Sequence, residues 1–264
     1  MQKLFLHNLF LKFLLLAIFM ASPGETQAAE KNEPQLHCAA ADKICILHEI
    51  ERQASLLENK TEKDQTLREL AKAYARAGKI EEAVALIPKI ITPDTQAMTI
   101  RGIGMEIADL KLPTEEQNAA FITLRAEAEK IAHPPSYAIA LTYIAMAQAF
   151  AGDNEGAWKT TTSMENASLS HKAFGETAEI QAEKGDYANA NTSLAKIDDP
   201  AYRNKATRNV SKILADKGLY EQSYDSASQI ANPYLRALAL QYLVDRQDSK
   251  IKPGAIPQKT ENRQ

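Results

Sequence analysis

Apolar residues recur along most of the chain at spacings of three and four, the spacing that places side chains on one face of an α-helix. Two examples are Leu67-Leu70-Ala71-Tyr74 and Ile139-Tyr143-Ile144-Ala147. From Thr61 to Gln247 no run of β-branched residues alternates with polar ones, as a strand would require. The pattern therefore predicts an all-α protein.

A second pattern repeats one arrangement of small residues. Four glycines each have a small residue seven positions earlier and another five positions later; they are Gly78, Gly152, Gly185 and Gly218. The last three lie 33 residues apart. Glycine accepts the left-handed conformation that often ends a helix, so each marks a turn between two helices. A fixed period of this size is typical of stacked structural repeats.

Prolines give an independent count of the repeats. Pro93, Pro134, Pro200 and Pro233 are separated by 41, 66 and 33 residues. Because 66 is twice 33, one repeat between Pro134 and Pro200 lacks the proline. The 41-residue interval predicts an insertion of eight residues, either near Lys111–Glu116 or in the helix that follows. Proline does not continue a helix, so each one marks the entry to a repeat.

These two patterns divide the chain. The first helices of successive pairs are expected to begin near Asp64, Ala97, Ala138, His171, Asn204 and Ala237. The second helices are expected at Lys79–Ile91, Thr114–Ala132, Glu155–Met164, Ala188–Ile197 and Tyr220–Ile230. We expect a signal peptide at residues 1–28, an N-terminal segment with a capping helix (Ala41–Leu57) at 29–60, the repeats at 61–249 and a disordered tail at 250–264.

The repeats resemble the tetratricopeptide repeat superfamily. The motifs that carry the resemblance are Leu67-x2-Leu70-Ala71-x2-Tyr74-x3-Gly78-x4-Ala83 and Ile100-x2-Ile103-Gly104-x2-Ile107. The chain departs from the family in its period of 33 rather than 34, in lacking an aromatic residue at the first consensus position, and in a proline about two positions early. The resemblance implies a right-handed solenoid of about five helix pairs, which binds other proteins.

The small residues support paired helices without the resemblance. Two helices approach to about 8–10 Å only where the residues at the contact are small. Small residues stand at five matching positions of the first helices, which are Ala71, Gly104, Ala145, Ala178 and Ser211. We therefore expect each to lie against its second helix.

The N-terminus has the pattern of an export signal. Lys3 and Lys12 precede nine uninterrupted apolar residues, and a small-residue site follows that suits cleavage after Ala28. Nine residues are fewer than the roughly 20 that span a bilayer. Without residues 1–28 the chain has 29 basic and 33 acidic residues, a net charge of −4. This charge argues against nucleic-acid binding, and we expect no membrane association after cleavage.

No catalytic constellation is visible. The sequence lacks Gly-x-Ser-x-Gly, a phosphate-binding glycine-rich loop and His-Glu-x-x-His. Gly102-Ile103-Gly104 falls inside a predicted helix, without the strand that a dinucleotide-binding motif needs. We expect neither enzymatic activity nor a cofactor.

The cysteine pair has two interpretations. In an oxidising compartment Cys38 and Cys45 would form a disulfide. Seven residues of continuous helix would hold their Cα atoms about 10 Å apart, too far for a bridge, so a disulfide predicts a helix start near Asp42. The alternative adds His37 and His48 as a zinc ligand set, but its spacing matches no common finger.

The resemblance places a partner groove along the first helices. The groove candidates are Arg68, Lys72, Arg76, Arg101, Ile139, Met146, Phe150, Lys205, Arg208 and Lys212. A basic groove with an apolar middle suits an acidic peptide or a C-terminal carboxylate. Glu179, Glu183 and Asp216 fall on the same surface and weaken its basic character. The alternative is a solvated helix face with ordinary charges.

The sequence therefore predicts an exported scaffold, periplasmic or else secreted, that binds a protein or peptide. Two alternatives remain open. In the first, the chain is a self-assembling structural protein. In the second, it is a helical accessory domain of envelope polysaccharide-processing machinery.

Overall fold

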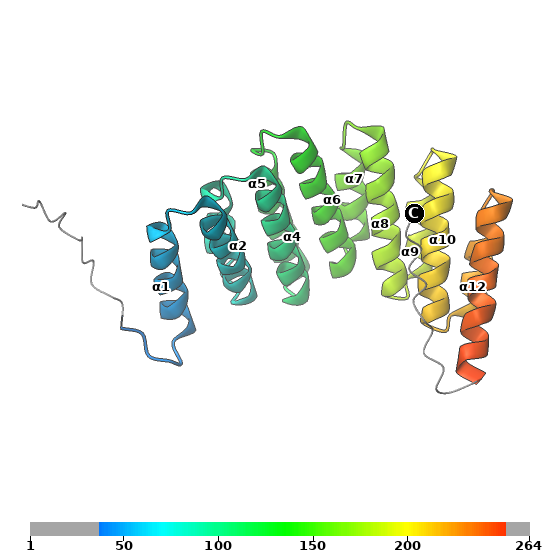
Figure 1. Ribbon diagram of the computed structural model, residues 1–264, viewed down its shortest axis with the longest axis horizontal. Helices are drawn as coiled ribbons and strands as arrows, with labels where there is room; N and C mark the ends of the chain where they lie inside the picture. Colours follow the sequence, from blue (N-terminus) through cyan, green and yellow to red (C-terminus); the bar gives the residue numbers. More distant parts are fainter. Residues whose placement is uncertain (1–36, 252–264) are drawn as a thin grey trace, which may run out of the picture. The chain divides into compact units, whose positions relative to one another are not determined.

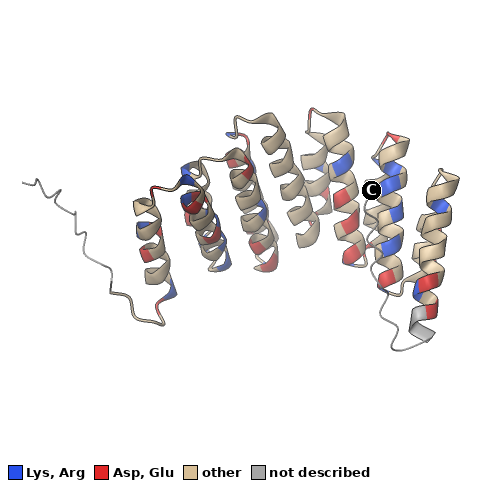
Figure 2. Cartoon of the chain, viewed as in Figure 1, with Lys and Arg blue, Asp and Glu red and all other residues tan. Residues whose placement is uncertain are grey.

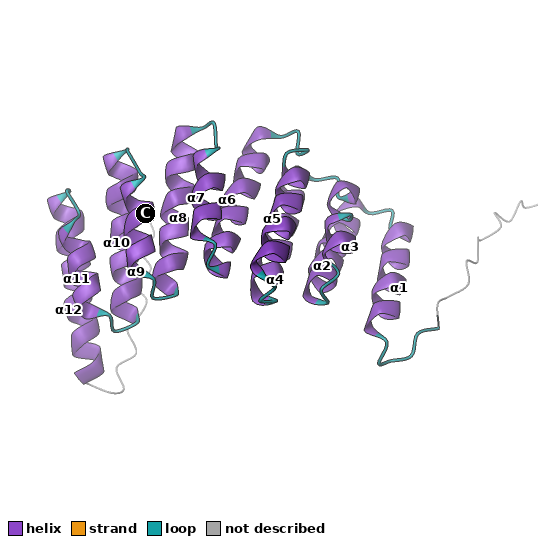
Figure 3. Cartoon of the chain, turned by 180° about the vertical axis from the view of Figure 1, so that it is seen from behind, coloured by secondary structure: helices purple, strands orange, loops and turns teal. Residues whose placement is uncertain are grey.

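The computed structural model describes residues 37–251, the last three by their backbone alone. The described part is all helical and contains no strand (Figures 1 and 3). The helices are α1 (Lys43–Leu56), α2 (Lys60–Arg76), α3 (Ile80–Val84), the 3-10 helix η1 (Ile87–Lys89), α4 (Pro93–Asp109), α5 (Thr114–Ala128), α6 (Pro134–Ala151), α7 (Asn154–Thr162), α8 (Ala167–Glu183), α9 (Tyr187–Ala195), α10 (Pro200–Asp216), α11 (Tyr220–Ser228) and α12 (Pro233–Ile251). The all-α prediction is confirmed.

Two predicted segments lie outside the description. The predicted signal peptide at residues 1–28 is one of them. Of the predicted tail, residues 250 and 251 belong to α12, and the remainder lies outside the described residues.

The even-numbered helices from α2 to α12 form a series in which each packs against the next; we call them the A helices. They lie side by side in Figure 1. The B helices α3, α5, α7, α9 and α11 each pack against the A helix before and the A helix after. Buried apolar side chains fill the space between these helices, and α1 packs on α2 at the N-terminal end of the series.

Every A helix begins four residues before its predicted start. Pro93, Pro134, Pro200 and Pro233 occupy the first helical position rather than the preceding linker. A first-turn residue needs no N–H donor, and the fixed φ of proline suits a helix there. The prolines therefore mark the starts of α4, α6, α10 and α12, but as first helical residues.

The second helices all end two to four residues before their predicted ends, and the first of them is also interrupted. The expected helix at Lys79–Ile91 is broken into α3 and η1. Pro88 cannot donate a backbone hydrogen bond, and its ring clashes with a helix that continues through it. The insertion lies mainly in α5, which has 15 residues where α7, α9 and α11 each have 9. Its prediction near Lys111–Glu116 or in the following helix is confirmed.

The four glycines lie in turns that end A helices. Gly78, Gly152, Gly185 and Gly218 have φ of 75°, 92°, 79° and 77°. Residues with side chains rarely adopt this left-handed conformation. The prediction of a glycine-dependent turn after each of these helices is confirmed.

The small residues were expected to lie against the second helices, and a Cβ added at Gly104 would indeed lie 3.5 Å from the side chain of Leu124 on α5. The closest contacts are with neighbouring A helices. All five lie buried in the A helices: Ala71, Gly104, Ala145, Ala178 and Ser211. A Cβ added at Gly104 would lie 3.0 Å from the Cβ of Ala147, so α4 and α6 are in close contact. One added at Gly175 would lie 3.1 Å from the Cβ of Ala206, which places α8 equally close to α10.

A repeated side-chain contact joins neighbouring repeats. The fourth residue of three A helices donates to the backbone carbonyl that precedes its linker. Arg203 Nε donates to Ile197 at 2.6 Å, and Arg236 Nε donates to Ile230 at 2.7 Å. Gln96 Nε2 makes the matching bond to Ile90 at 2.8 Å. These bonds satisfy carbonyls that follow a B helix. They also connect those carbonyls to the first turn of the next A helix.

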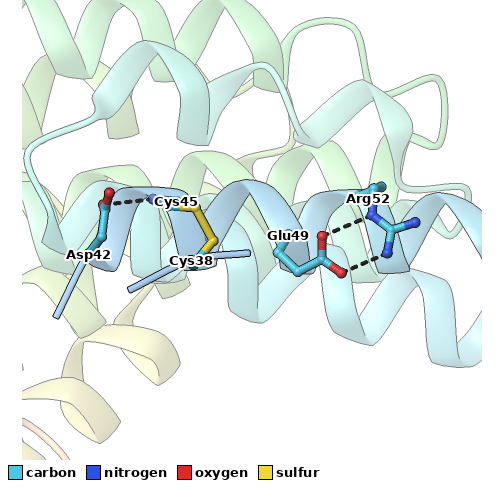
Figure 4. Close-up of a disulfide and its surroundings, with 5 residues drawn as sticks. All are labelled: Cys38, Asp42, Cys45, Glu49 and Arg52. Carbon is cyan, nitrogen blue, oxygen red and sulfur yellow. Dashed lines mark hydrogen bonds and ion pairs between the residues drawn. A yellow bond between two sulfur atoms is a disulfide. The ribbon is translucent and has the colours of Figure 1, made fainter. Parts of the chain in front are cut away.

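The N-terminal cysteines form a disulfide, as predicted (Figure 4). The Cα atoms of Cys38 and Cys45 are 5.6 Å apart. Helix α1 begins after Asp42, whose side chain accepts the N–H of Cys45 at 3.0 Å. The helix therefore starts between the two cysteines, which allows the bridge. Because both sulfur atoms are bonded to each other, they are not available as ligands for the alternative zinc set.

Candidate binding surface

One stripe of each A helix faces away from its B helix. It contains the sixth, tenth, thirteenth and seventeenth residues, whose spacings of four, three and four keep them on one face. In α6 these residues are Ile139, Tyr143, Met146 and Phe150, and in α8 they are Lys172, Glu176, Glu179 and Glu183. We call the surface formed by these stripes from α2 to α12 the A face. The predicted groove residues lie on the A face or next to it.

The basic candidates of α2 are paired within the protein. Arg68 Nε lies 3.0 Å from Glu69, and Lys72 Nζ lies 2.9 Å from the same carboxylate. Arg76 forms a two-bond contact with Glu106 of α4. The sequence identified these cations but not their partners, and the A face is consequently less basic at α2 than the count of cations suggested.

Two further candidate cations lie over aromatic rings. The guanidinium of Arg101 is 5.4 Å from the centre of the Tyr143 ring on α6. The ammonium of Lys212 is 4.7 Å from the Tyr242 ring on α12. Such contacts bind a cation through the negative face of the ring, so they link α4 to α6 and α10 to α12.

In the described part of the chain, the candidate cations of α10 lack the ion pairs that the α2 candidates form. Within residues 37–248, no carboxylate lies at ion-pair distance from Lys205, Arg208 or Lys212. The Nε atom of Arg208 is buried and has no hydrogen-bond partner among the described residues. Figure 2 shows this run of basic residues along α10.

The middle of the A face is apolar. Helix α6 contains no charged residue in its 18 positions, as Figure 2 shows. Its stripe continues onto α4 through Met98 and Met105. We call Met98, Met105, Ile139, Tyr143, Met146 and Phe150 the central apolar patch. Met98 is 36% exposed and Ile139 is 37% exposed, while the other four are half-buried.

Sequence reasoning found three residues of this patch and missed the others. Ile139, Met146 and Phe150 were groove candidates. Met98, Met105 and Tyr143 were not, although extending the 33-residue register by the eight inserted residues places both methionines beside the α6 stripe. Of the four methionines after Met20, three lie in the patch. Methionine is flexible and polarisable, and it recurs on surfaces that bind varied partners.

An acidic stripe follows on α8, shown in red in Figure 2. Burial raises the pKa of Glu179, against a hydrogen bond from Asn209 Nδ2 at 2.8 Å. A cavity of about 240 Å³ lies between α8 and α10, and Glu176, Glu179, Tyr202 and Lys205 contribute to its lining. This part of the A face therefore presents carboxylates next to the basic stripe of α10.

Two larger cavities lie away from the A face. One of about 660 Å³ lies between α5 and α7, where Phe121, Ile122 and Gly156 contribute to its lining. Another of about 420 Å³ is bordered by Ile131, Leu141 and Met164 near the α7–α8 connection.

Neither a metal site nor a membrane span is found in the described part. Residues 37–248 contain no group of three or more His, Cys, Asp or Glu side chains placed to hold a metal. No described helix is both long and apolar enough to cross a bilayer. Comparison with models of protein families gives no match, and comparison with characterised proteins gives none either. The function must be inferred from the geometry of this chain.

Proposed function

We propose that the protein is an exported, non-enzymatic scaffold built of tandem helix-hairpin repeats of the tetratricopeptide type, and that the A face binds a protein or peptide partner. The observation that carries this proposal is the central apolar patch. Six partly exposed apolar side chains gather on two adjacent helices, one of which has no charge at all. Contiguous exposed apolar surface of this kind typically marks an interaction site.

The arrangement of the helices supports the same proposal. Successive A helices pack side by side, and B helices cover their other side. A continuous surface built from one helix of every repeat is the usual binding surface of repeat proteins. The contacts of α2 with Glu69 and Glu106 reduce the basic contribution at one end, so the patch, rather than the basic residues, is the expected centre of binding.

The disulfide supports export. Structural disulfides persist in oxidising compartments and are rare in the cytosol, and the Cys38–Cys45 bridge fits that setting. We propose the periplasm, with secretion as the alternative, and the N-terminal export pattern at residues 1–28 is consistent with both.

Site-specific photocrosslinking in the producing cell tests the proposal. A crosslinker at position 109, beside the patch, should capture a discrete partner. The variant Met105→Asp/Met146→Asp should abolish the capture, because a charge opposes burial of the patch. The matched control is Ile122→Asp on α5, where an isoleucine 70% exposed lies on a B helix.

Circular dichroism must show that both variants keep their helix content. Capture that survives the double patch variant and is lost with Ile122→Asp would move the interface to the B helices. Absence of any captured partner with the wild-type protein would contradict the scaffold proposal.

A further inference from the structure

The thirteenth residues of the A helices form a row across the A face. From α2 to α12 they are Lys72, Met105, Met146, Glu179, Lys212 and Asp245. Each lies at the same level of its helix, so the row crosses the helices one residue at a time. From α2 to α12 its residues are basic, apolar, apolar, acidic, basic and acidic.

Close contacts set the spacing of this row. The 3.0 Å approach at Gly104 joins α4 to α6, and the 3.1 Å approach at Gly175 joins α8 to α10. Packed helices have axes about 8–10 Å apart. A ligand that contacts successive residues of the row must therefore present one side chain about every 9 Å, with all of these side chains on the same side of the ligand.

A polyproline II segment meets this requirement. It has three residues per turn and rises about 3.1 Å per residue, so residues i, i+3 and i+6 share one side at intervals of about 9 Å. A β-strand does not, since residues three apart point to opposite sides. An α-helix rises about 1.5 Å per residue and would need about six residues for each step.

We propose that the A face binds an extended, polyproline II-like segment with apolar residues at i and i+3, a basic residue at i+6 and an acidic residue at i+9. The apolar residues lie on Met105 and Met146, the basic residue meets Glu179, and the acidic residue meets Lys212. This inference rests on the proposed function and adds the chemistry of the partner. It replaces the expectation of a simply acidic peptide, because the α2 cations are already paired.

The charged part of the row suits such a segment. Among the described residues, neither Glu179 nor Lys212 forms an ion pair. The hydrogen bond from Asn209 holds the Glu179 carboxylate, and the Tyr242 ring supports the Lys212 ammonium. Both groups are thereby oriented without being neutralised, which favours recognition by charge complementarity.

Fluorescence anisotropy with labelled peptides tests the inference. The probes are LPPLPPKPPE and its reverse EPPKPPLPPL, because the row does not fix the chain direction. The charge-swapped control is LPPLPPEPPK with its reverse, and the spacing control is LPLPKPE, which has the same side chains two residues apart. We expect one probe to bind about tenfold more tightly than the charge-swapped control, the effect of two matched rather than two opposed surface charge pairs. It should also bind more tightly than the spacing control, whose side chains cannot contact successive residues of the row.

A charge exchange in the protein completes the test. The variant Glu179→Lys/Lys212→Glu should reverse the preference and bind the charge-swapped peptide more tightly, while Met146→Glu should weaken all the peptides. Thermal unfolding confirms that each variant is folded. If the preference does not reverse, Glu179 and Lys212 are not the partners of the charged peptide residues, and the proposed pattern is wrong.

Failure of this inference is distinguishable from failure of the scaffold proposal. Equal binding of probe and control, or tighter binding of the spacing control, would overturn the pattern and leave the patch as the binding surface. Absence of binding by every peptide would also overturn the pattern, and the photocrosslinking result would then decide the scaffold proposal by itself.

Discussion

Ser211 of α10 and Ser223 of α11 face each other across a helix hairpin, and each hydroxyl donates a hydrogen bond to the other's backbone carbonyl, at 2.9 and 2.8 Å. Both residues are buried. The equivalent pairs are alanines in three other hairpins, as in Ala178 and Ala190, and α4 has Gly104 at this position. Small volume is therefore the common requirement at this contact, and the paired hydroxyls are an addition of the last hairpin.

Removal of one hydroxyl should lower the free energy of unfolding. We expect Ser211→Ala to cost about 1 kcal/mol, the net value of a typical hydrogen bond. The double variant Ser211→Ala/Ser223→Ala recreates the alanine pair and should cost less than the sum of the single changes. Urea denaturation of the single and double variants measures this. Ser211→Leu should cost more than either, and a leucine variant as stable as the wild type would show that the contact is not close.

Two glycines of α4 should respond oppositely to alanine. A Cβ at Gly104 meets the Cβ of Ala147, which is fixed to the backbone of α6, so Gly104→Ala should destabilise by about 1 kcal/mol or more. The three atoms nearest to a Cβ at Gly102 all belong to the side chain of Lys72, with Cγ at 2.5 Å, so Lys72 must change rotamer. Lys72 can move at the cost of an exposed ion pair.

Gly102→Ala should therefore be neutral or stabilising by up to about 1 kcal/mol, because alanine favours a helix more than glycine does. The two variants control for each other, since both change a glycine in the same helix. Equal effects measured by thermal unfolding would contradict the close approach of α4 and α6.

The buried carboxylate of Asp64 should make stability depend on acid pH. It accepts the backbone N–H groups of Ile91 and Thr92, both at 2.9 Å. Burial alone would raise its pKa, but the hydrogen bonds from Thr92 and Ile91 outweigh burial and lower the pKa below the ordinary value of 3.8. The ionised form therefore stabilises the fold above about pH 4, and this contribution is lost as the pH falls through the lower folded-state pKa.

We expect Asp64→Ala to destabilise by about 2 kcal/mol at pH 7, because the backbone N–H groups of Ile91 and Thr92 lose their acceptor and a buried side chain is truncated. Asp64→Asn should cost less, since the side-chain oxygen of Asn204 accepts the N–H of Ala231 in the matching place of α10. Urea denaturation at pH 7 and at pH 3 tests this, and the difference between wild type and Asp64→Asn should shrink at the lower pH. If the stability difference between wild type and Asp64→Asn were the same at both pH values, ionisation of the Asp64 carboxylate would not be its cause.

Reduction of the disulfide should loosen the start of α1 and leave the later helices intact. Opening so short a loop costs about 2 kcal/mol in the chain-entropy account. Hydrogen exchange should accelerate for amides near Leu47 after addition of dithiothreitol, and stay slow near Ile103 of α4. The Cys38→Ser/Cys45→Ser variant should exchange rapidly at its N-terminus with or without the reductant. Acceleration throughout α4 would mean that the bridge stabilises more than α1.

The periodic features were predictable because each depends on few neighbouring residues. Apolar spacing and glycine turns gave the helices and their order, and the cysteine spacing gave the helix start beside Asp42. The helix starts were placed four residues late because proline both breaks a helix interior and begins a helix. The break at Pro88 was not predicted, because this proline lies inside an otherwise helical pattern.

The position of the candidate surface on the helices was predictable from the sequence, but the interactions that decide its charge were not. Counting by repeats placed Arg68, Arg101 and Lys212 on the A helices, where they lie. Their partners come from neighbouring positions or from the next repeat, as Tyr143 and Tyr242 do. Such contacts depend on side-chain direction and on the separation of two helices, and neither is visible in a residue count.

The sequence by itself determined the helical class, the turns at the four glycines, the small residues between helices and the possibility of the disulfide. Each follows from local conformational preference or from a repeating spacing. Only the tertiary structure decided which charges are neutralised, that Met98 and Met105 continue the apolar stripe of α6, and that Met146, Glu179 and Lys212 lie in one row. The relationships between helices join residues 30 to 41 positions apart. They exist only once packing has fixed the distance and level of neighbouring helices.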